Sequence, residues 1–233
     1  HVYRALMIAN ELVGHNLVFL CSEDDRLAAD FIREKNFLVE TCPEDARTDC
    51  ILQLRPHLLI NDVLDTEKAF MQTVKAAGMA VVNFEDLGPG MAQADLVINA
   101  LYPPSMGADN VRSGPQYFCL REEFLHLADT PPAPDSREVL LCFGGVDEGN
   151  LTLQVLRAIH DHCRELGMRA VVVLGPGYMH RAALEEALVS LEPDAVEIVR
   201  STSVISEYMQ RAEMAITSGG RTVLELADKR LPG

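Results

Sequence analysis

The chain has 233 residues, of which 35 are acidic and 20 are basic, so its formal net charge is −15. This balance disfavours a nucleic-acid-binding protein, because nucleic acids are bound by clusters of Lys and Arg that displace counterions. Apolar residues make up 48% of the sequence, which excludes a disordered chain and allows a hydrophobic core in one large domain or two small ones.

The first half of the sequence alternates between helix and strand patterns. Apolar residues at helical spacing predict helices over residues 2–12, 24–35 and 67–77, and Gly78 ends the last of them. Short apolar runs predict strands over residues 16–21, 58–60, 79–82 and 96–98.

The second half of the sequence repeats this alternation. Apolar runs predict strands over residues 139–143, 169–174, 196–199 and 214–216. Helical spacing predicts helices over residues 151–166, 181–190, 204–211 and 222–228. Apolar strands that alternate with helices are typical of parallel sheets, so we expect an α/β fold.

A proline-rich segment separates the two halves. Three of the residues 131–134 are proline, which neither continues a helix nor donates a hydrogen bond within a central strand. We therefore expect a linker over residues 129–137, between an N-terminal lobe of residues 1–128 and a C-terminal lobe of residues 138–233. A surface loop within one large sheet is the alternative. Because the chain starts at His1 and ends soon after a predicted helix, we also expect cut ends and a truncated second lobe.

Ligands of open parallel sheets bind beyond the carboxyl ends of the strands, so the loops that follow strands are candidate sites. The loop 143–150 joins a strand to a helix and contains Gly144 and Gly145, where the backbone can come close to a ligand. Asn150 is a suitable N-cap for the helix, and exposed amides in this loop suit a phosphate. A plain tight turn is the alternative.

A second loop with the same character occupies residues 218–222. Ser218 and Thr222 offer hydroxyl groups, and Gly219 and Gly220 offer free backbone amides. Glu225 lies one helical turn after Thr222, and an acidic side chain at such a place suits a ribose diol. The alternative is a capped helix start with Glu225 in solvent.

A third glycine, Gly175, follows the strand 169–174 and is expected either to form a wall of a nucleotide pocket or to make a turn. None of these glycine loops matches the GxGxxG pattern of dinucleotide-binding folds or the GxxxxGK[ST] pattern of P-loop proteins. The sequence therefore disfavours a Rossmann dehydrogenase and a P-loop ATPase.

Two acidic residues follow strands in the first half of the chain. Asp62 and Asp86 are candidates for contacts with substrate hydroxyls or for acid/base catalysis, and loop hydrogen bonding or N-capping is the alternative role. His1 precedes an amphipathic helix, where the near-neutral pKa of a histidine suits a general base. Its position taken alone is equally explained by the place at which the chain starts.

The histidines and cysteines show no spacing typical of metal ligands, so we expect no metal. The 6 cysteines form no CxxC pair and are expected to be buried, reduced thiols. No apolar run approaches the roughly 18 residues that span a bilayer, and no basic start leads into an apolar stretch. We therefore expect no membrane span, no signal peptide and a cytoplasmic location.

Four segments together resemble a known family, the UDP-sugar hydrolases of pseudaminic acid synthesis, which are PseG-like and related to the SpsG spore-coat proteins. His1–Leu6 resembles the end of the motif G-x-G-H-x-x-R-x-L, in which His1 and Arg4 match the His and Arg. Gly114–Phe124 is similar to G-P-x-Y-x-x-L-R-x-E-F, and Phe143–Leu151 to F-G-G-x-D-x-x-N-L. Residues 218–222 with Glu225–Ala227 resemble the last motif, which is also similar to a nucleotide-contacting stretch of MurG-like GT-B glycosyltransferases.

The resemblance implies a GT-B-like architecture, with two Rossmann-like lobes, parallel sheets and an interdomain cleft. It implies that the second lobe binds the nucleotide and that His1 activates the water that displaces the nucleoside diphosphate from the anomeric carbon. Arg4, Asp62 and Asp86 are then expected on the sugar side, with Asp62 assisting proton transfer. The implied substrate is a UDP-linked amino sugar of nonulosonic acid or surface-polysaccharide biosynthesis, and the resemblance implies no metal and no organic cofactor.

Departures from the family motifs lie in the first lobe. Asn61–Asp65 lacks the aromatic residue of V-D-x-Y, Glu85–Leu87 replaces D-D-L, and Ile98–Tyr102 replaces a D-Q-N-like segment. These changes favour a different sugar, and the variant resembles PseG-like domains that are fused to a cytidylyltransferase. A GT-B glycosyltransferase and a non-catalytic nucleotide-sugar-binding domain are the alternative functions.

Overall fold

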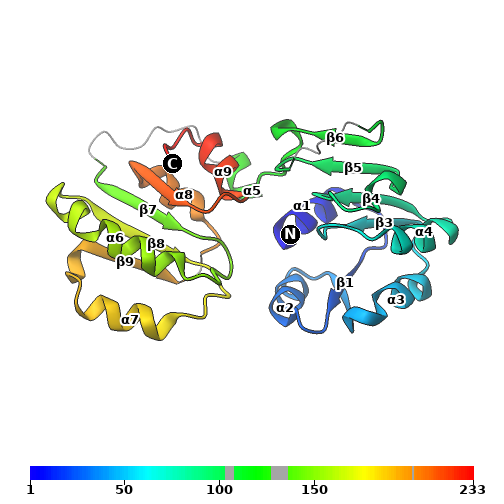
Figure 1. The fold of residues 1–233 in the computed structure, drawn as a ribbon, viewed down its shortest axis with the longest axis horizontal. Coiled ribbons are helices and arrows are strands. Elements are labelled where there is room, and N and C mark those ends of the chain that lie inside the picture. Colours follow the sequence, from blue (N-terminus) through cyan, green and yellow to red (C-terminus); the bar gives the residue numbers. More distant parts are fainter. Residues whose placement is uncertain (103–107, 127–135, 201) are drawn as a thin grey trace. The chain divides into compact units, whose positions relative to one another are not determined.

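The structure is a computed structural model that describes residues 1–102, 108–126, 136–200 and 202–233. It contains two compact units, which are His1–Arg121 (unit 1) and Glu122–Gly233 (unit 2). Figure 1 shows that each unit combines a sheet with surrounding helices. No helix of the described residues is both long enough and apolar enough to cross a membrane.

The unit boundary lies earlier than the expected boundary at residue 128. The short helix α5 (Glu122–His126) belongs to unit 2, because Glu123 accepts hydrogen bonds from the backbone N and the Oγ of Ser206 at 3.1 and 2.6 Å. Phe124 is buried, and its carbonyl accepts a hydrogen bond from Lys229 Nζ at 3.5 Å. Residues 129–135 of the expected linker lie outside the described residues.

Unit 1 contains a four-stranded sheet and a separate pair of strands, and all of their pairings are parallel. The sheet has the order β3 (Leu58–Asn61), β4 (Ala80–Phe84), β5 (Leu96–Asn99) and β6 (Val111–Ser113), and the pair consists of β1 (Val18–Ser22) and β2 (Leu38–Cys42). The helices are α1 (Val2–Glu11), α2 (Arg26–Glu34), α3 (Arg47–Leu54) and α4 (Lys68–Ala76), with 3₁₀ turns η1 (Glu44–Ala46), η2 (Met91–Gln93) and η3 (Pro115–Tyr117).

The core of unit 1 lies between its sheet and two helices. Val81 of β4 and Val97 of β5 pack with Ile51 of α3 and with Met71 and Val74 of α4. All five side chains are at most 4% exposed, so each contributes roughly 1.5–3 kcal/mol of burial free energy. This packing fixes the directions of β3, β4 and β5 and therefore the edge at which their carboxyl ends meet.

Unit 2 has one parallel sheet with the strand order β10 (Met214–Thr217), β7 (Glu138–Cys142), β8 (Arg169–Leu174) and β9 (Val196–Arg200). Its helices besides α5 are α6 (Leu151–Glu165), α7 (Arg181–Val189), α8 (Ile205–Arg211) and α9 (Thr222–Asp228), with a 3₁₀ turn η4 (Pro193–Ala195). The predicted ranges of β8 and α9 agree with the structure at both ends.

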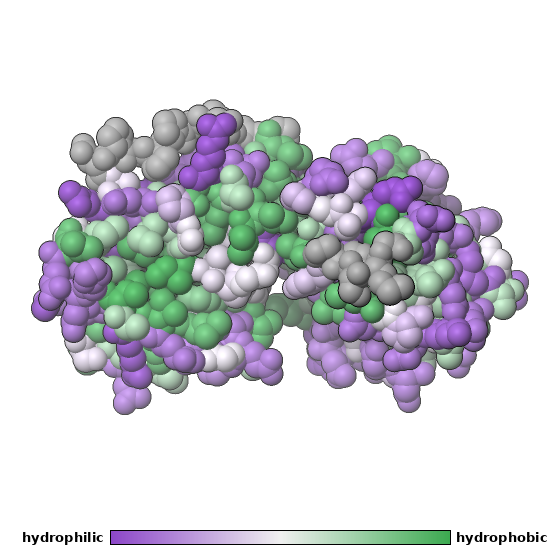
Figure 2. Space-filling model, turned by 45° about the horizontal axis from the view of Figure 1, so that its top comes forward, coloured by the Kyte–Doolittle hydropathy of each residue, from purple (hydrophilic) through white to green (hydrophobic). Residues whose placement is uncertain are grey.

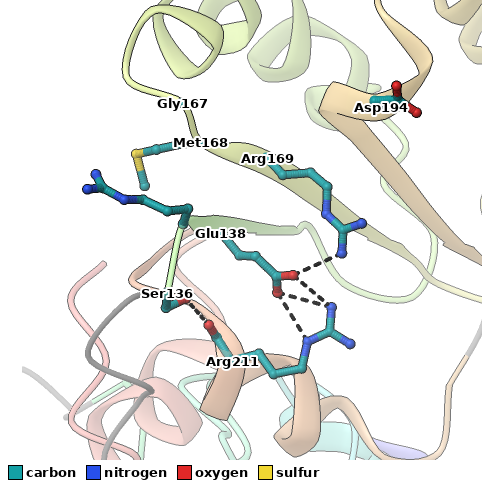
Figure 3. Close-up of a pocket in the computed structure, with 8 residues that line it drawn as sticks. Ser136, Glu138, Gly167, Met168, Arg169, Asp194 and Arg211 are labelled. Carbon is teal, nitrogen blue, oxygen red and sulfur yellow. Dashed lines mark hydrogen bonds and ion pairs between the residues drawn. The ribbon is translucent and has the colours of Figure 1, made fainter.

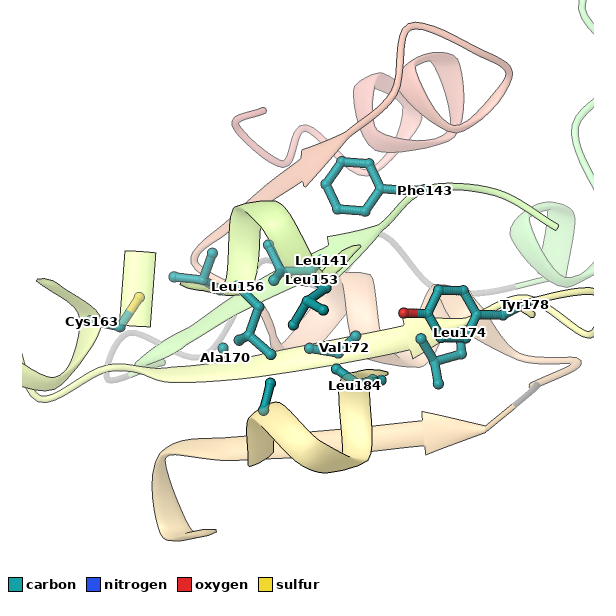
Figure 4. Packing of buried hydrophobic residues seen from close by; sticks show 12 residues of the cluster. Leu141, Phe143, Leu153, Leu156, Cys163, Ala170, Val172, Leu174, Tyr178 and Leu184 are labelled. Carbon is teal, nitrogen blue, oxygen red and sulfur yellow. The ribbon is translucent and has the colours of Figure 1, made fainter. Parts of the chain in front are cut away.

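The core of unit 2 explains why its central strands are apolar throughout. Alternate residues of β7 and β8, such as Leu141 and Val172, pack against Leu156 of α6 and Leu184 of α7 (Figure 4). The intervening residues point to the other face of the sheet, yet Val171 among them is only 1% exposed. A sheet that is buried on both faces requires the continuous apolar runs that predicted these strands.

Among the α-helices and strands of the described residues, β2, α3, β6 and α5 were not predicted from the sequence. The strand β2 has three exposed positions out of five, and it therefore lacks an apolar run. The helix α3 has a sequence, RTDCILQL, in which Ile51 is the buried residue. These segments are too short for an apolar pattern to predict them, and their contacts with neighbouring elements, such as the burial of Ile51 in the core of unit 1, hold them in place.

Candidate functional site

The carboxyl ends of β3 and β4 place several polar side chains at one edge of the unit 1 sheet. Asn61 of β3 is paired in register with Asn83 of β4, and its Nδ2 donates a hydrogen bond to Asn83 Oδ1 at 2.8 Å. The next residues along the two strands include Asp62 and Glu85. Because the strands are parallel, these two acidic residues are brought to the same edge although 22 residues separate them in the chain.

Arg4, from the first turn of α1, bridges the two carboxylates. Its Nε donates to Asp62 Oδ2 at 2.8 Å, its Nη2 donates to Asp62 Oδ1, and its Nη1 donates to Glu85 Oε1 at 2.9 Å. The guanidinium also lies over the Phe84 ring, with 5.0 Å between Cζ and the ring centroid. Arg4 is only 3% exposed, and a buried cation of this kind is stable only when it is paired and hydrogen-bonded.

His1 completes this network, because its Nδ1 lies 2.6 Å from Asp62 Oδ1. An ionised carboxylate only accepts hydrogen bonds, so Nδ1 carries the proton in this contact, and in the neutral ring Nε2 keeps its lone pair. The His1 side chain is 55% exposed, whereas that of Asp62 is 12% exposed. The arrangement places a partly exposed imidazole in direct contact with a fixed anion.

The ionisation of Asp62 depends on its partners. Burial raises the pKa of this carboxyl, but hydrogen bonds and positive charge from Arg4 and His1 outweigh burial and leave the pKa below its ordinary value. For Arg4, burial lowers the pKa, and the hydrogen bond and charge of Asp62 together with the charge of Glu85 raise it overall. Both groups are therefore ionised at neutral pH.

Asp86 lies beside this network but is fully buried. Its Oδ1 accepts hydrogen bonds from the backbone amides of Thr66 and Gly88, both at 2.9 Å, and its Oδ2 accepts from Thr66 Oγ1 and Asn83 Nδ2, both at 2.6 Å. These bonds tie the loop after β4 to the loop after β3. Loop hydrogen bonding, the alternative that the sequence left open, is thus favoured over direct contact between Asp86 and a sugar.

In unit 2 the glycine loop after β7 is organised by Asp147, which was not among the predicted site residues. Its carboxylate accepts hydrogen bonds from the amides of Leu151 and Thr152 at 2.8 and 2.9 Å, and it therefore caps α6. Asn150 occupies the N-cap position without a side-chain cap bond, and its Oδ1 instead accepts from Tyr178 Oη at 2.7 Å. Asn150 is therefore at the N-cap as expected, but its side chain does not cap the helix, because Asp147 already accepts the hydrogen bonds of the two amides.

The loops after β7 and β8 touch through their backbones at Gly175. A Cβ atom at this position would lie 2.3 Å from both the Gly144 and the Gly145 carbonyl oxygens. Gly177 N also donates to the Gly145 carbonyl at 2.9 Å. By contrast, a Cβ at Gly144 or Gly145 would meet nothing within 4 Å, so this part of the loop has open space in front of it.

The loop after β10 places its glycines at the same sheet edge. A Cβ at Gly219 or Gly220 would meet nothing within 4 Å, and Ser218 and Thr222 are half-buried. Glu225 is 3% exposed. The alternative prediction, in which Glu225 lies in solvent, is therefore wrong. Glu225 lies in the first turn of α9.

Apolar side chains are exposed beside these loops of unit 2. Val146 is 50% exposed, Met179 is 73% exposed and Val223 is 44% exposed, and each lies in or next to a loop that follows a strand. Figure 2 shows hydrophobic as well as hydrophilic surface on the molecule. Apolar surface around a few polar groups is typical of small-molecule sites.

A depression of about 490 Å³ lies at the opposite, amino edge of the same sheet (Figure 3). Glu138, the first residue of β7, accepts a hydrogen bond from Arg169 Nη2 at 2.9 Å and another from Arg211 Nε at 3.1 Å. The charges of Arg169 and Arg211 are therefore paired with Glu138 within the protein. Ligands of parallel sheets bind at the carboxyl edge, so this depression is a weaker candidate than the glycine loops.

Thiols and metal ligands add no further site among the described residues. Cys42, Cys142 and Cys163 are buried thiols, whereas Cys21, Cys50 and Cys119 are half-buried, so full burial was wrong for three of the 6 cysteines. Burial raises the pKa of Cys21, Cys42 and Cys163. In the described part of the chain, no group of three or more His, Cys, Asp or Glu side chains could hold a metal ion.

Comparisons with known proteins bear on the fold. No protein-family profile matches the chain. An uncharacterized protein of Methanocaldococcus jannaschii, MJ1062, is 28% identical over 244 residues, and the match covers 97% of this chain and 50% of that protein. The chain thus spans about half the length of the curated relative that it matches.

The crystal structure of Acinetobacter baumannii MurG matches with a TM-score of 0.60 at 16% identity and covers 98% of this chain and 73% of that chain. A similarity at this identity concerns the fold alone, so the resemblance to PseG-like hydrolases stays a prediction. The expected fold class is confirmed. The chain has a GT-B-like α/β fold with parallel sheets, which it shares with MurG.

Proposed function

We propose that this protein hydrolyses a nucleotide-activated amino sugar and releases the nucleoside diphosphate, in nonulosonic acid or surface-polysaccharide biosynthesis. One observation carries the proposal, namely the 2.6 Å contact between His1 Nδ1 and Asp62 Oδ1, with Asp62 held in turn by buried Arg4. This arrangement is that of a general base oriented by a carboxylate.

The proposed reaction is a displacement by water at the anomeric carbon. His1 Nε2 takes a proton from water as the water oxygen forms a bond to that carbon. The bond between the carbon and the diphosphate oxygen breaks, and the nucleoside diphosphate leaves with the bonding electrons. Asp62 stabilises the imidazolium that forms, because the carboxylate is an anion in direct contact with the ring.

The nucleotide is assigned in this proposal to the glycine loops of unit 2. Its contacts would be made by Gly144, Gly145, Asn150, Gly175, Ser218, Gly219, Gly220, Thr222 and Glu225. The open space at Gly145, Gly219 and Gly220 supports a close approach of phosphate to the backbone. Since Asp147 accepts hydrogen bonds from the Leu151 and Thr152 amides, the phosphate is expected at the glycines rather than at these two amides.

The experiment incubates the full-length natural protein with a panel of UDP- and CMP-linked amino sugars and follows nucleotide release without any acceptor. We expect release of UDP by the wild type and at least a roughly 100-fold loss in His1→Ala, the range typical for removal of a general base. His15→Ala is the matched control, because His15 is an exposed histidine of the same unit. Equal rates for His1→Ala and the wild type would contradict the role of His1.

A second candidate function is that of a GT-B glycosyltransferase, which is favoured by the fold shared with MurG. The nucleotide site would be the same, but the hydroxyl of an acceptor would replace water. Nucleotide release that starts only after an acceptor is added would select this function. A third candidate is a nucleotide-sugar-binding domain of a longer protein, since the chain spans 50% of MJ1062; binding without release under either condition would select it.

A further inference from the structure

Glu85 is a buried carboxylate that the proposed reaction does not use. Its side chain is 2% exposed, and its oxygens accept hydrogen bonds from Arg4 Nη1 at 2.9 Å and from the amides of Ala100 and Leu101 at 3.2 and 3.1 Å. Its backbone is left-handed, with a φ of 55°, a conformation that is uncommon for a residue with a long side chain. The fold therefore holds Glu85 firmly and away from solvent.

Arg4 connects Glu85 to the candidate base. The guanidinium is planar, and its three nitrogens donate in fixed directions, two of them to Asp62 and the third to Glu85. Because the third donor is anchored, the guanidinium cannot rotate away from Asp62. Asp62 Oδ1, which receives one of these bonds, is also the atom that contacts His1 Nδ1.

We propose that Glu85 is a positioning residue, which acts through Arg4 and Asp62 to keep the proton of neutral His1 on Nδ1. For its catalytic meaning the inference rests on the proposed function, but the effect on His1 itself does not. Glu85 makes no contact with substrate in this role, because it is buried.

The test measures the tautomer of His1 directly. The ¹⁵N chemical shifts of the imidazole are recorded on the full-length protein at a pH at which the ring is neutral, for wild type, Glu85→Gln and Glu44→Gln. Glu44 is an exposed acid of the same unit that pairs with Arg47, so its variant is the matched control. We expect Nδ1–H in wild type and Glu44→Gln, and a shift toward the Nε2–H form in Glu85→Gln. An unchanged tautomer in Glu85→Gln overturns the proposal.

A second variant guards against loss of folding in Glu85→Gln. Arg4→Lys keeps the positive charge and Glu85 but lacks the planar fork, so the same shift toward Nε2–H is expected. If Arg4→Lys keeps the wild-type tautomer, the bridging geometry is irrelevant and the inference is wrong.

Kinetics distinguish this inference from the proposed function. If the protein hydrolyses a nucleotide sugar, Glu85→Gln is expected to lower kcat by at least about 10-fold and to change KM less than about 2-fold, because only the base is affected. If no nucleotide sugar is hydrolysed but the tautomer shifts, the proposed function fails and the positioning role stands. If Glu85→Gln raises KM and leaves the tautomer of His1 unchanged, Glu85 contributes to substrate binding instead.

Discussion

At the scale of single residues, Asp62 is the point on which the candidate site depends. It receives two hydrogen bonds from Arg4 and one from His1. The folded protein lowers its pKa, so folding favours the ionised form. A carboxyl with a depressed pKa contributes stability above its unfolded pKa of about 3.9, and this contribution is lost as the pH falls through the lower folded pKa.

Asp62→Asn should therefore destabilise the protein in a pH-dependent way. At neutral pH we expect a loss of roughly 3 kcal/mol in the free energy of unfolding, because Arg4 loses one of the partners of its buried charge. The difference between variant and wild type should shrink as the pH falls below about 4, because Asp62 of the unfolded wild type takes up a proton there and Asp62 of the folded wild type does so at its lower pKa.

Urea unfolding at a series of pH values checks this prediction. Asp45→Asn is the control, since Asp45 is exposed in η1 and carries the same charge. A difference between Asp62→Asn and wild type that stays constant into acid would show that the carboxylate charge of Asp62 does not stabilise the fold.

At the scale of elements, the loop after β7 depends on its cap and on its contact with the loop after β8. The sequence indicated a loop with an N-cap, but the structure assigns the capping bonds to Asp147 and leaves Asn150 to Tyr178. Both residue types are good caps, so their chemistry could not choose between them. Both backbones are left-handed, with φ values of 49° at Asp147 and 51° at Asn150, so the hydrogen bonds of the folded loop rather than the backbone conformation assign the cap to Asp147.

Asp147→Ala should lower the free energy of unfolding by about 1 kcal/mol, with a range of roughly 0.5–2 kcal/mol, because two amides of α6 lose their acceptor. Thermal or urea unfolding measures the loss. Glu148→Ala serves as control, since Glu148 is an exposed neighbour whose side chain makes no capping bond to Leu151 or Thr152. A larger loss in Glu148→Ala than in Asp147→Ala would contradict this assignment.

Gly175→Ala and Gly145→Ala should differ in their effect on the free energy of unfolding. At Gly175 a Cβ would lie 2.3 Å from two backbone carbonyls that cannot move independently, so we expect a loss of roughly 1–3 kcal/mol in stability. At Gly145 it would meet nothing within 4 Å, so stability should change by less than about 0.5 kcal/mol.

The same pair of variants tests the nucleotide proposal. If phosphate approaches the backbone at Gly145, Gly145→Ala should weaken UDP binding in calorimetry although it unfolds at the wild-type temperature. Unchanged UDP affinity in Gly145→Ala would remove Gly145 from the proposed site.

At the scale of the whole molecule, the proposed function divides the roles between unit 1 and unit 2. Hydrogen exchange in the presence of UDP tests this division, because a ligand that binds the native state slows the opening of the segments that it contacts. We expect slower exchange in residues 144–150 and 218–222, and little change around Asp62 or in β1 and β2. Protection confined to unit 1 would reverse the proposed roles.

The alternation of apolar runs in the sequence determined the fold class and most strands and helices. Strands buried on both faces, such as β7 and β8, need uninterrupted apolar residues, and such a run can be recognised in the sequence alone. The glycine loops were located for the same reason, since they follow such strands directly. Elements without an apolar run, such as β2 and β6, were missed because their neighbours rather than their own side chains specify them.

Only the tertiary structure decided which polar residues act together. Arg4 and Glu85 are 81 positions apart, and no local pattern indicates that a guanidinium of α1 would bridge the carboxyl ends of β3 and β4. Hydrophobic burial, which sets the pattern of the sequence, is non-directional, whereas a hydrogen-bonded charge network requires specific distances and angles. Those distances exist only once α1 has packed at the sheet edge, so the partners of His1 and Asp62 were fixed by the fold.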